Sequence, residues 1–348
     1  MAAHAIPVEL DDVTPAWLAA VLARDVGDVQ VVDLHSGTTG RARIVVTDAG
    51  GATEPLFVKL APFDERQRRF VDAVGLGVAE ARFYRDLAPQ VPVRVPRVLY
   101  ASFDDDGHYA MVLEDLVATG CRLPSPHDDD VVEVTNSLVD ELALLHASYW
   151  EDPSLTGEHA WLGDGARQAF GGGGSYIARA LDRFGPEMSP GFRRLAGLYV
   201  ENTPAIARIY TTGSPTLVHG DPHFGNLFVD SGRTGFFDWA MTMRRAGMWD
   251  VAYVLCNSIP TDVRRANEHE WLRRYREGLA RGGVHLDAAT IWEQYRLFAV
   301  YSWSSATSTA GVGSRWQTEE VGRGGMARAT AAVDDLDSIA LLESLLSG

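Results

Sequence analysis

The chain has 348 residues, 46% of them apolar and 22% charged, which is the composition of a globular protein with enough length for two domains. Its 31 Lys and Arg residues against 47 Asp and Glu residues give a formal net charge of −16. Such an acidic surface repels phosphate backbones, so it argues against a dedicated nucleic-acid binder or a protein of anionic membranes.

The N-terminal third predicts a small sheet with two helices. Thr14 is a capping residue followed by Pro15, a pattern that predicts a helix through about Arg24. A second helix is expected over 78–87. Five segments have the composition of strands: 29–37, 41–50, 55–61, 97–104 and 108–116. The turn at 104–107 joins the last two as a hairpin, so we expect a five-stranded antiparallel sheet.

The composition changes after Leu116. Residues 117–130 hold a glycine, two prolines and an acidic run, which predicts a linker. Further helices are predicted at these positions: 131–149, 191–210, 248–258, 262–281 and 288–306. A short β-like stretch covers 216–240. The sequence therefore predicts an α+β, two-lobed fold, with an N-terminal nucleotide-binding lobe (1–116) and a larger, mainly helical C-terminal catalytic and substrate-binding lobe (117–348).

The compartment is predicted from what the chain lacks. Cys121 and Cys256 form neither a disulfide framework nor a cysteine-based zinc site. The first residues do not have the pattern of a secretory signal, and no run of 18 apolar residues occurs. We expect a cytoplasmic monomer or homodimer with no nucleic-acid or membrane partner.

The densest group of reactive side chains lies between residues 219 and 239, in HGDPHFGN and FDW. Glycine and proline place Asp221, Asn226 and Asp238 on loops, and two short apolar strands are expected to bring those loops together. Two carboxylates and an amide oxygen are ligands that Mg²⁺ takes in proteins. A carboxylate in such a place can also orient and deprotonate an attacking hydroxyl.

A second group of charges precedes it. Lys59 lies in the apolar strand FVKL, where a lone cation is costly unless it is paired. Glu80, 21 residues further on in a predicted helix, is the candidate partner. A lysine held by a glutamate and directed at phosphate oxygens is the arrangement of phosphoryl-transfer enzymes. If the polar group at 219–239 were absent, the better interpretation would be that Lys59 faces outward from its strand and that Glu80 is a solvated helix residue.

Two other functions stay open at this point. His219, Asp221 and His223 could bind a transition metal and make the chain a metal-dependent hydrolase. The same fold could also be a catalytically inactive nucleotide-binding scaffold. A turn of solvated polar residues explains one aspartate but not the whole crowded group.

The strand lysine, the helix glutamate, HGDPHFGN and FFDW, in that order, resemble the aminoglycoside phosphotransferase superfamily of protein-kinase-like fold, which also contains choline kinases. The resemblance runs from about Val31 to about Ala280. LHASYWEDPSL and GMWDVAYVLCNSIP are most similar to its ecdysteroid-kinase-like and uncharacterised bacterial branches. It implies ATP and Mg²⁺ as cofactors, and transfer of the γ-phosphate to a hydroxyl of a small molecule.

The resemblance also implies roles for matched residues. Asp221 would be the catalytic base, and Asn226 and Asp238 would hold Mg²⁺. Lys59, fixed by Glu80, would contact the α- and β-phosphates. The residues expected to shape the catalytic loop are His219 and Asp250. The other expected nucleotide contacts are the phosphate-covering turn Ser36, Gly37, Thr38, Thr39 and Gly40, and the adenine-binding Met111, Glu114, Asp115 and Leu116.

The sequence departs from the family pattern at the phosphate contacts. It has no G-x-G-x-x-G loop, and Asp221 is followed by Pro-His rather than by a cation, so Arg41, Arg244 or Arg245 could help to neutralise the phosphate. Candidate acceptor contacts are His223, Arg244 and the aromatic residues Tyr149, Trp150, Trp161, Trp239, Trp303 and Trp316. Aromatic faces suit a rigid ring or an ammonium group, so the acceptor could be an antibiotic, a sugar, an amino alcohol or a steroid-like molecule.

Overall fold

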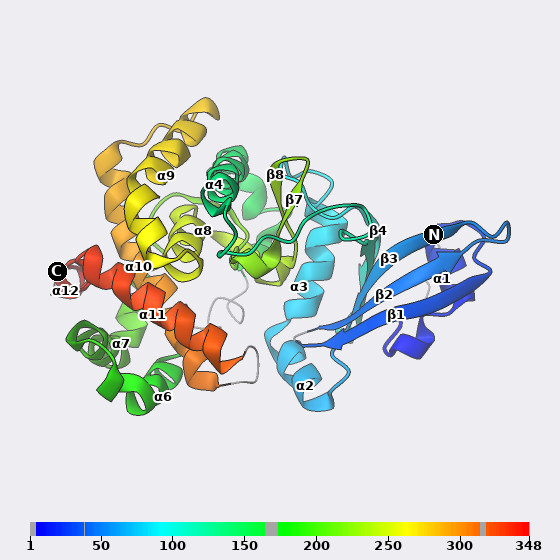
Figure 1. Ribbon diagram of the computed structural model, residues 1–348, viewed down its shortest axis with the longest axis horizontal. Helices are drawn as coiled ribbons and strands as arrows, with labels where there is room; N and C mark the ends of the chain where they lie inside the picture. The colour runs from blue at the N-terminus through cyan, green and yellow to red at the C-terminus, as the bar shows by residue number, and fades with distance from the viewer. Residues whose placement is uncertain (1–4, 38, 164–172, 314–317, 348) are drawn as a thin grey trace. The chain divides into compact units, whose positions relative to one another are not determined.

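The computed structural model describes residues 5–37, 39–163, 173–313 and 318–347; Thr38 and Trp316 lie outside the described residues. The chain groups into two compact units (Figure 1). The first unit contains Met1–Leu123, Phe228–Ser231 and Gly235–Thr242. The second unit contains Pro124–Leu227, Gly232–Thr234 and Met243–Gly348.

The first unit is built on the predicted five-stranded antiparallel sheet, in the order β1-β2-β3-β5-β4. The strands are β1 (Asp28–Ser36), β2 (Gly40–Thr47), β3 (Thr53–Leu60), β4 (Val98–Phe103) and β5 (Tyr109–Glu114). Alternate residues of β2 are buried, as expected for a strand with one face on the core. Leu18 of α1 (Pro15–Leu22) belongs to that core, and the Thr14 side chain caps α1 as predicted. The register places Lys59 opposite Arg41 on one side and Met111 on the other.

Helices follow β3 in the first unit. These are α2 (Glu65–Val74), α3 (Leu76–Arg82) and the π-helical turn η2 (Phe83–Leu87). The predicted helix over 78–87 corresponds to α3 and η2. No helix was predicted at α2, because half of its residues are charged and only Val71 is buried.

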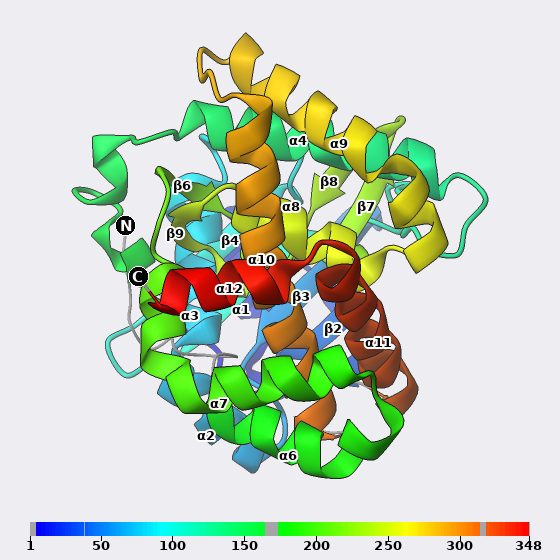
Figure 2. The same cartoon turned by 90° about the vertical axis from the view of Figure 1, so that its left-hand side faces the viewer.

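The second unit is mainly helical, as predicted. Its helices are α4 (Val131–Ser148), α6 (Gly174–Phe184), α7 (Pro190–Ile209), α8 (Met248–Tyr253), α9 (Thr261–Arg281), α10 (Ala288–Val312), α11 (Glu319–Asp335) and α12 (Ser338–Ser347). The central helix is α10, which contacts α6, α8, α11 and α12 (Figure 2). The sequence analysis did not identify α6, α11 or α12.

The remaining strands and helical turns are short. β6 (Pro215–Val218) pairs with β9 (Met243–Ala246), and β7 (Leu227–Asp230) pairs with β8 (Arg233–Phe236). The short helical turns are η1 (Leu10–Asp12), η3 (Pro153–Leu155), η4 (Ala160–Gly163), η5 (Gly185–Glu187), η6 (Phe224–Asn226), η7 (Trp239–Met241) and η8 (Val254–Ser258).

Two late segments of the chain complete the first unit. Phe236 N–H donates to the Arg94 carbonyl at 2.9 Å, and Arg122 and Val229 exchange two backbone hydrogen bonds of 3.0 and 2.8 Å. The ring of Trp239 stacks on Phe83, with centroids 4.0 Å apart. The segments 228–231 and 235–242 are therefore part of its core.

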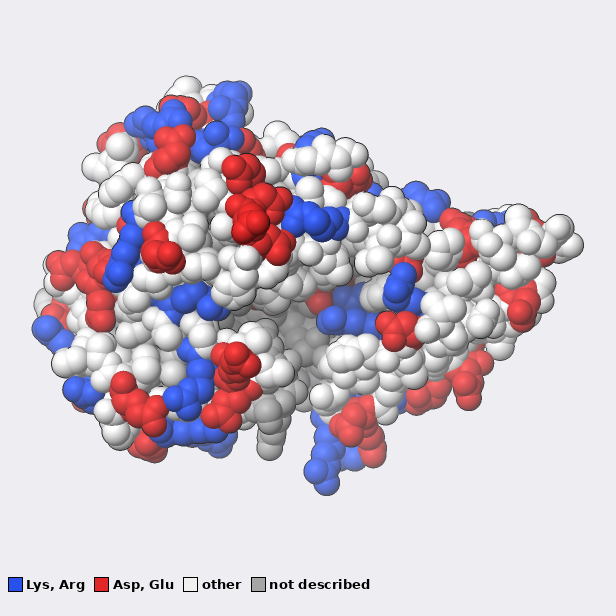
Figure 3. Space-filling model, viewed as in Figure 1, with Lys and Arg blue, Asp and Glu red and all other residues white. Residues whose placement is uncertain are grey.

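Charged side chains are dispersed on one face of the molecule (Figure 3), and both thiols are buried. Acidic and basic side chains are intermixed on the face drawn in Figure 3, so the excess acid there is dispersed. Cys121 and Cys256 are both buried and free. Among the described helices, none is both long and apolar enough to cross a membrane.

Candidate functional site

The ion pair expected between Lys59 and Glu80 is present in the first unit. Lys59 Nζ lies 2.6 Å from Glu80 Oε1, and both side chains are almost fully buried. Burial raises the pKa of the Glu80 carboxyl, and the neighbouring Lys59 charge only partly offsets this. Glu80 Oε2 has no hydrogen-bond partner among the described residues. The lysine is thus held in place by a carboxylate that is shielded from water.

Asp238 lies beside this pair, between two cations. Its carboxylate is 3.4 Å from Lys59 Nζ and 3.0 Å from Arg41 Nη2. The backbone of Asp238 is left-handed (φ 64°), a conformation that aspartate tolerates better than most residues and that is frequent at functional sites. Arg41 also donates from Nε to Thr39 Oγ1 at 3.0 Å. The ends of β2 and β3 therefore present two cations, a donor set that suits phosphate oxygens.

The turn between β1 and β2 is tied down at its ends. Gly37 N–H donates to the Thr39 carbonyl at 3.0 Å, and Phe63 N–H donates to Ser36 Oγ at 3.1 Å. A Cβ on Gly40 would lie 2.6 Å from the Ala61 carbonyl oxygen, so only glycine fits there. The structure describes each residue of the predicted phosphate turn except Thr38.

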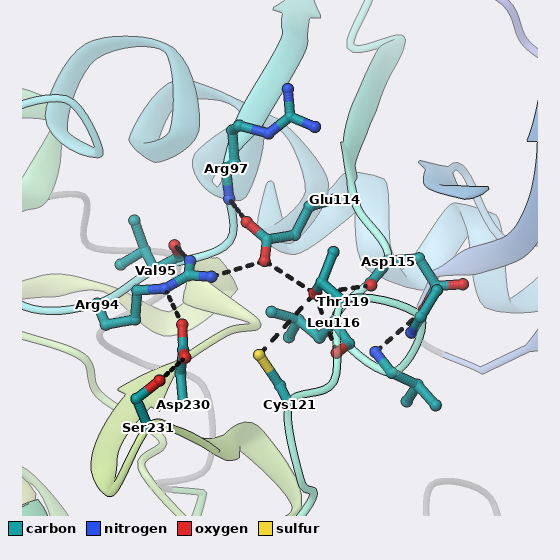
Figure 4. Close-up of polar contacts among 12 residues, drawn as sticks. Arg94, Val95, Arg97, Glu114, Asp115, Leu116, Thr119, Cys121, Asp230 and Ser231 are labelled. Carbon is teal, nitrogen blue, oxygen red and sulfur yellow. Dashed lines mark hydrogen bonds and ion pairs between the residues drawn. The ribbon is translucent and has the colours of Figure 1, made fainter. Parts of the chain in front are cut away.

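Glu114, predicted near adenine, belongs to a polar cluster at the end of β5 (Figure 4). Its carboxylate accepts hydrogen bonds of 2.6 Å from Arg94 Nη2 and from Arg97 N–H. Arg94 also donates to Asp230 at 2.9 Å. Burial by itself raises the pKa of the Glu114 carboxyl, but the Arg94 and Arg97 donors more than offset it, and the pKa lies below its ordinary value.

The neighbouring predicted adenine contacts are also engaged within the first unit. Asp115 accepts from Arg43 Nε at 2.7 Å and from the N–H groups of the next turn. The Leu116 carbonyl accepts from Cys121 N–H at 2.9 Å, and Met111 is fully buried in β5. The carboxylates of Glu114 and Asp115 thus hold the turn after β5 in shape.

The catalytic-loop candidate of the second unit is anchored by Asp250. Its fully buried carboxylate accepts from His219 N–H at 2.7 Å and from Gly220 N–H at 2.9 Å. One of its oxygens is also 3.3 Å from His146 Nε2. Asp250 is on α8, so this helix fixes the backbone just before Asp221.

Asp221 is held by three neighbours and is partly exposed. Its Oδ1 accepts a 2.6 Å hydrogen bond from the Tyr253 hydroxyl, and its Oδ2 lies 3.7 Å from His223 Nε2. Asn226 Nδ2 donates to the Asp221 carbonyl at 2.9 Å. Burial, together with the nearby Asp221 charge, raises the pKa of Tyr253 well above its ordinary value, so the phenol keeps its proton and donates. The sequence analysis missed Tyr253, although it follows Asp250 by one helical turn.

A cavity of about 600 Å³ opens next to this loop. Tyr253 and His223, the two side chains beside the Asp221 carboxylate, both line it. Its described lining belongs entirely to the second unit and includes Phe224, Ser258, Thr309 and Arg328. The cavity is large enough for a small organic molecule.

Most of the predicted acceptor residues lie elsewhere. Trp239 and Trp303 are fully buried, the first stacked on Phe83 and the second packed against Phe192, so both are core residues. Tyr149 is also buried, and Arg244 is on β9 opposite Leu217. Of the residues predicted to contact the acceptor, His223 is the one found among the described lining residues of the cavity. The acceptor candidates Trp150 and Trp161 do not line it, and Trp316 is outside the described residues. Arg245, expected near the phosphate, does not line it either.

The loop does not have the geometry of a transition-metal site. His219 is fully buried, and its Nδ1 accepts from Asp221 N–H at 3.2 Å. Within the described part of the chain, the group of three potential ligand atoms within 4.8 Å of one another is Asp104, Asp106 and His108, on the β4–β5 hairpin. His219, Asp221 and His223 therefore do not converge as the hydrolase hypothesis requires.

Comparison with known proteins was made at the level of sequence families and of structures. A model of the phosphotransferase enzyme family matches residues 30–298. No curated protein sequence matches the chain.

Solved structures with a kinase-like fold resemble the chain at low identity. Aminoglycoside 2'-phosphotransferase-IIIa in complex with GDP is 15% identical, with a TM-score of 0.53 over 91% of this chain and 96% of that one. A choline kinase from Streptococcus pneumoniae is 11% identical, with a TM-score of 0.51 over 94% and 99% of the two chains. A choline/ethanolamine kinase family protein from Mesorhizobium loti is 15% identical, with a TM-score of 0.51 over 98% and 100%.

Proposed function

The chain belongs to the phosphotransferase enzyme family, and we propose that it transfers the γ-phosphate of Mg·ATP to a hydroxyl group of a small molecule. The observation that carries this proposal is the placement of Asp221. Its carboxylate is partly exposed and is held by Tyr253, and the two side chains beside it, Tyr253 and His223, line a cavity of suitable size. A carboxylate in this position is able to act on a hydroxyl bound in that cavity.

The proposed reaction is a direct in-line transfer. Asp221 accepts the proton of the acceptor hydroxyl while its oxygen forms a bond to the γ-phosphorus. The bond from that phosphorus to the β–γ bridging oxygen breaks, and the products are ADP and a phosphate monoester. Tyr253 donates a short 2.6 Å hydrogen bond to Oδ1, whereas Oδ2 accepts a longer one of 3.3 Å from Asn226 Nδ2, so we propose Oδ2 as the oxygen that takes the proton. The protein's contribution is positioning and charge neutralisation, as in other phosphoryl transfers.

The nucleotide phosphates have candidate partners in the first unit. Lys59 is fixed by Glu80, and Arg41 stands beside it with Asp238 between them. We propose that Lys59 binds the α- and β-phosphates and that the turn from Ser36 to Gly40 covers them. Met111 and the backbone of residues 114–116 are the proposed adenine contacts.

The residues present also fit a bound Mg²⁺. Asn226 uses its Nδ2 as a donor to Asp221, and no described residue donates to its amide oxygen. Asp238 offers a carboxylate that lies beside the cations Arg41 and Lys59. Carboxylate and amide oxygens are the ligands of a hard divalent cation, so these two residues would hold the metal. When bound, it would neutralise charge on the phosphates.

Replacement of Asp221 tests the base assignment. Asp221→Asn should lower the rate of acceptor-dependent ADP release about 10²- to 10⁴-fold, the usual contribution of a general base. Its affinity for ATP should stay within a few-fold of the wild type. Asp182→Asn, an exposed aspartate on α6, is the matched control and should keep full activity. An Asp221→Asn protein with most of its activity would exclude Asp221 as the base.

Thermal-shift measurements separate this function from the alternatives. ATP should raise the melting temperature, and more so with Mg²⁺ present. GTP should be tested as well, because one of the similar structures contains GDP. The absence of any metal-dependent nucleotide effect would contradict the kinase function, and stabilisation by zinc alone would favour a hydrolase. ADP release should also be screened with a set of hydroxylated compounds. If nucleotides stabilise the protein but no compound causes ADP release, the chain would be an inactive scaffold.

A further inference from the structure

The cavity beside Asp221 carries an unneutralised cation. Arg328, on α11, lines the cavity and donates from Nε to the Asn257 carbonyl at 2.7 Å. Within the described part of the chain, no carboxylate pairs with its guanidinium, and burial alone lowers the pKa of Arg328. Two other arginines of the second unit pair with carboxylates, Arg264 with Glu268 and Arg233 with Glu141.

The position of the Arg328 guanidinium follows from the glycines of α11. Its Nη1 lies 3.3 Å from the point where a Cβ on Gly324 would be, so the side chain runs back along the helix over that glycine. Gly322, Gly324 and Gly325 all line the cavity. The absence of side chains at these three positions leaves the wall next to the guanidinium open.

The described lining of the cavity holds no carboxylate that pairs with that cation. Glu320 is the one carboxylate among its described lining residues, and it is exposed. It precedes Arg328 by eight positions on the same helix and forms no ion pair with it. The remaining titratable lining residues are His127, His223 and Tyr253, none of which supplies a negative charge near neutral pH.

We propose that the acceptor of this enzyme is an organic acid that also carries a hydroxyl group, and that its carboxylate binds Arg328 while its hydroxyl lies at Asp221. A guanidinium with unused N–H donors recognises a carboxylate through two parallel hydrogen bonds. This proposal rests on the proposed function, since it names the substrate class of the same site. It disfavours cationic acceptors such as amino alcohols, which would meet Arg328 with a like charge.

Binding of matched ligand pairs tests the proposal without any turnover. The probes are gluconate, glucuronate, shikimate and 4-hydroxyphenyllactate, each compared with its own primary amide by calorimetry on the full chain. At least one acid should bind the wild-type protein tenfold or more tightly than its amide. In Arg328→Gln that preference should vanish, with the affinity for the amide changed less than threefold. Arg328→Lys should keep part of the preference, because it keeps the charge but not the two parallel hydrogen bonds.

Glu320→Gln, which removes the exposed carboxylate of the same cavity, is the control, and it should not weaken binding of the acids. The proposal is overturned if no acid binds better than its amide, or if Arg328→Gln weakens both members of a pair equally. If Arg328→Gln does not fold, the proposal is tested by the ratio of the affinities for the acid and for its amide, measured on the wild type and on Arg328→Lys. ADP release is then measured with the acid that binds best. Binding without ADP release would contradict the proposed function and leave the anion site established.

Discussion

Asp250→Asn should destabilise the protein through the backbone of the catalytic-loop candidate. The Asp250 carboxylate is fully buried and accepts two backbone hydrogen bonds, from His219 N–H at 2.7 Å and Gly220 N–H at 2.9 Å. An asparagine keeps one acceptor oxygen and turns an NH₂ group toward the second N–H. One hydrogen bond to a charged group is then lost, about 1.5–3 kcal/mol, and a buried donor is left without a partner, about 1–3 kcal/mol. The expected loss in the free energy of unfolding is therefore about 2.5–6 kcal/mol.

Urea denaturation at pH 7 measures this loss, and Asp287→Asn is its matched control. Asp287 also accepts a backbone hydrogen bond, from Thr290 N–H at 2.7 Å, but it is exposed at the start of α10, where asparagine caps a helix equally well. The control should denature like the wild type. Folded Asp250→Asn protein should also turn over about 10²-fold more slowly, because a displaced loop misplaces Asp221. A loss in stability below about 1 kcal/mol would refute the reasoning that this carboxylate holds the loop.

Two further substitutions test the first unit. Glu114→Gln should lower the free energy of unfolding by about 1–3 kcal/mol at pH 7, because its charged acceptor holds Arg94. The pKa of Glu114 in the folded state is lower than its ordinary value of 4.5. The stability that its charge provides is therefore present above pH 4.5 and is lost as the pH falls through the folded-state pKa. Denaturation measured from about pH 7 to about pH 3 should show the difference between Glu114→Gln and the wild type becoming smaller toward acid. Gly77→Ala should cost about 2–3 kcal/mol in thermal unfolding, because the new Cβ would lie 1.9 Å from Cζ of the buried Tyr109 ring.

Each of these has a control in the same kind of element. Glu65→Gln removes the exposed pair of Glu65 with Arg69 and should change stability little at any pH. If the difference in stability between Glu114→Gln and the wild type did not change with pH, the charge of Glu114 would not be the source of its stabilising effect. Gly197→Ala, in α7, meets nothing within 4 Å and should be neutral or slightly stabilising. If Gly77→Ala behaved like Gly197→Ala, the close packing of α3 on Tyr109 would be wrong.

The sequence predicted those features of the fold and site that depend on residues close together in the chain. The composition of five short segments and the turn at 104–107 predicted the sheet, and the apolar run around Lys59 predicted its pairing with Glu80. The residues around Asp221 were identified because glycine, proline and several polar groups are crowded between apolar segments. Such signals lie within a few residues of one another, or in one strand and the next helix.

Contacts between distant segments were not predictable in the same way. Tyr253 donates to Asp221 across 32 residues, and its place in an apolar helix gives no sign of a partner. Arg328 lies on α11, whose glycine-rich sequence has no clear apolar period. Trp303 was expected to contact the acceptor because large aromatic side chains can stack on ring-shaped molecules. Large aromatic side chains are also favourable to bury, and Trp303 is fully buried in this fold.

The stacking of Trp239 on Phe83 has a consequence for the order in which the protein can be made. Thr242, the last residue of the first unit, is 119 positions after Leu123. At about 5–20 residues per second, a ribosome needs about 6–24 s to add that stretch. During this time the apolar surface around Phe83 has no Trp239 to cover it, so the first unit cannot complete its core as it emerges. For the same reason a gene cut after codon 123 would give an N-terminal fragment without its last core residues, and the two units should be expressed as one chain.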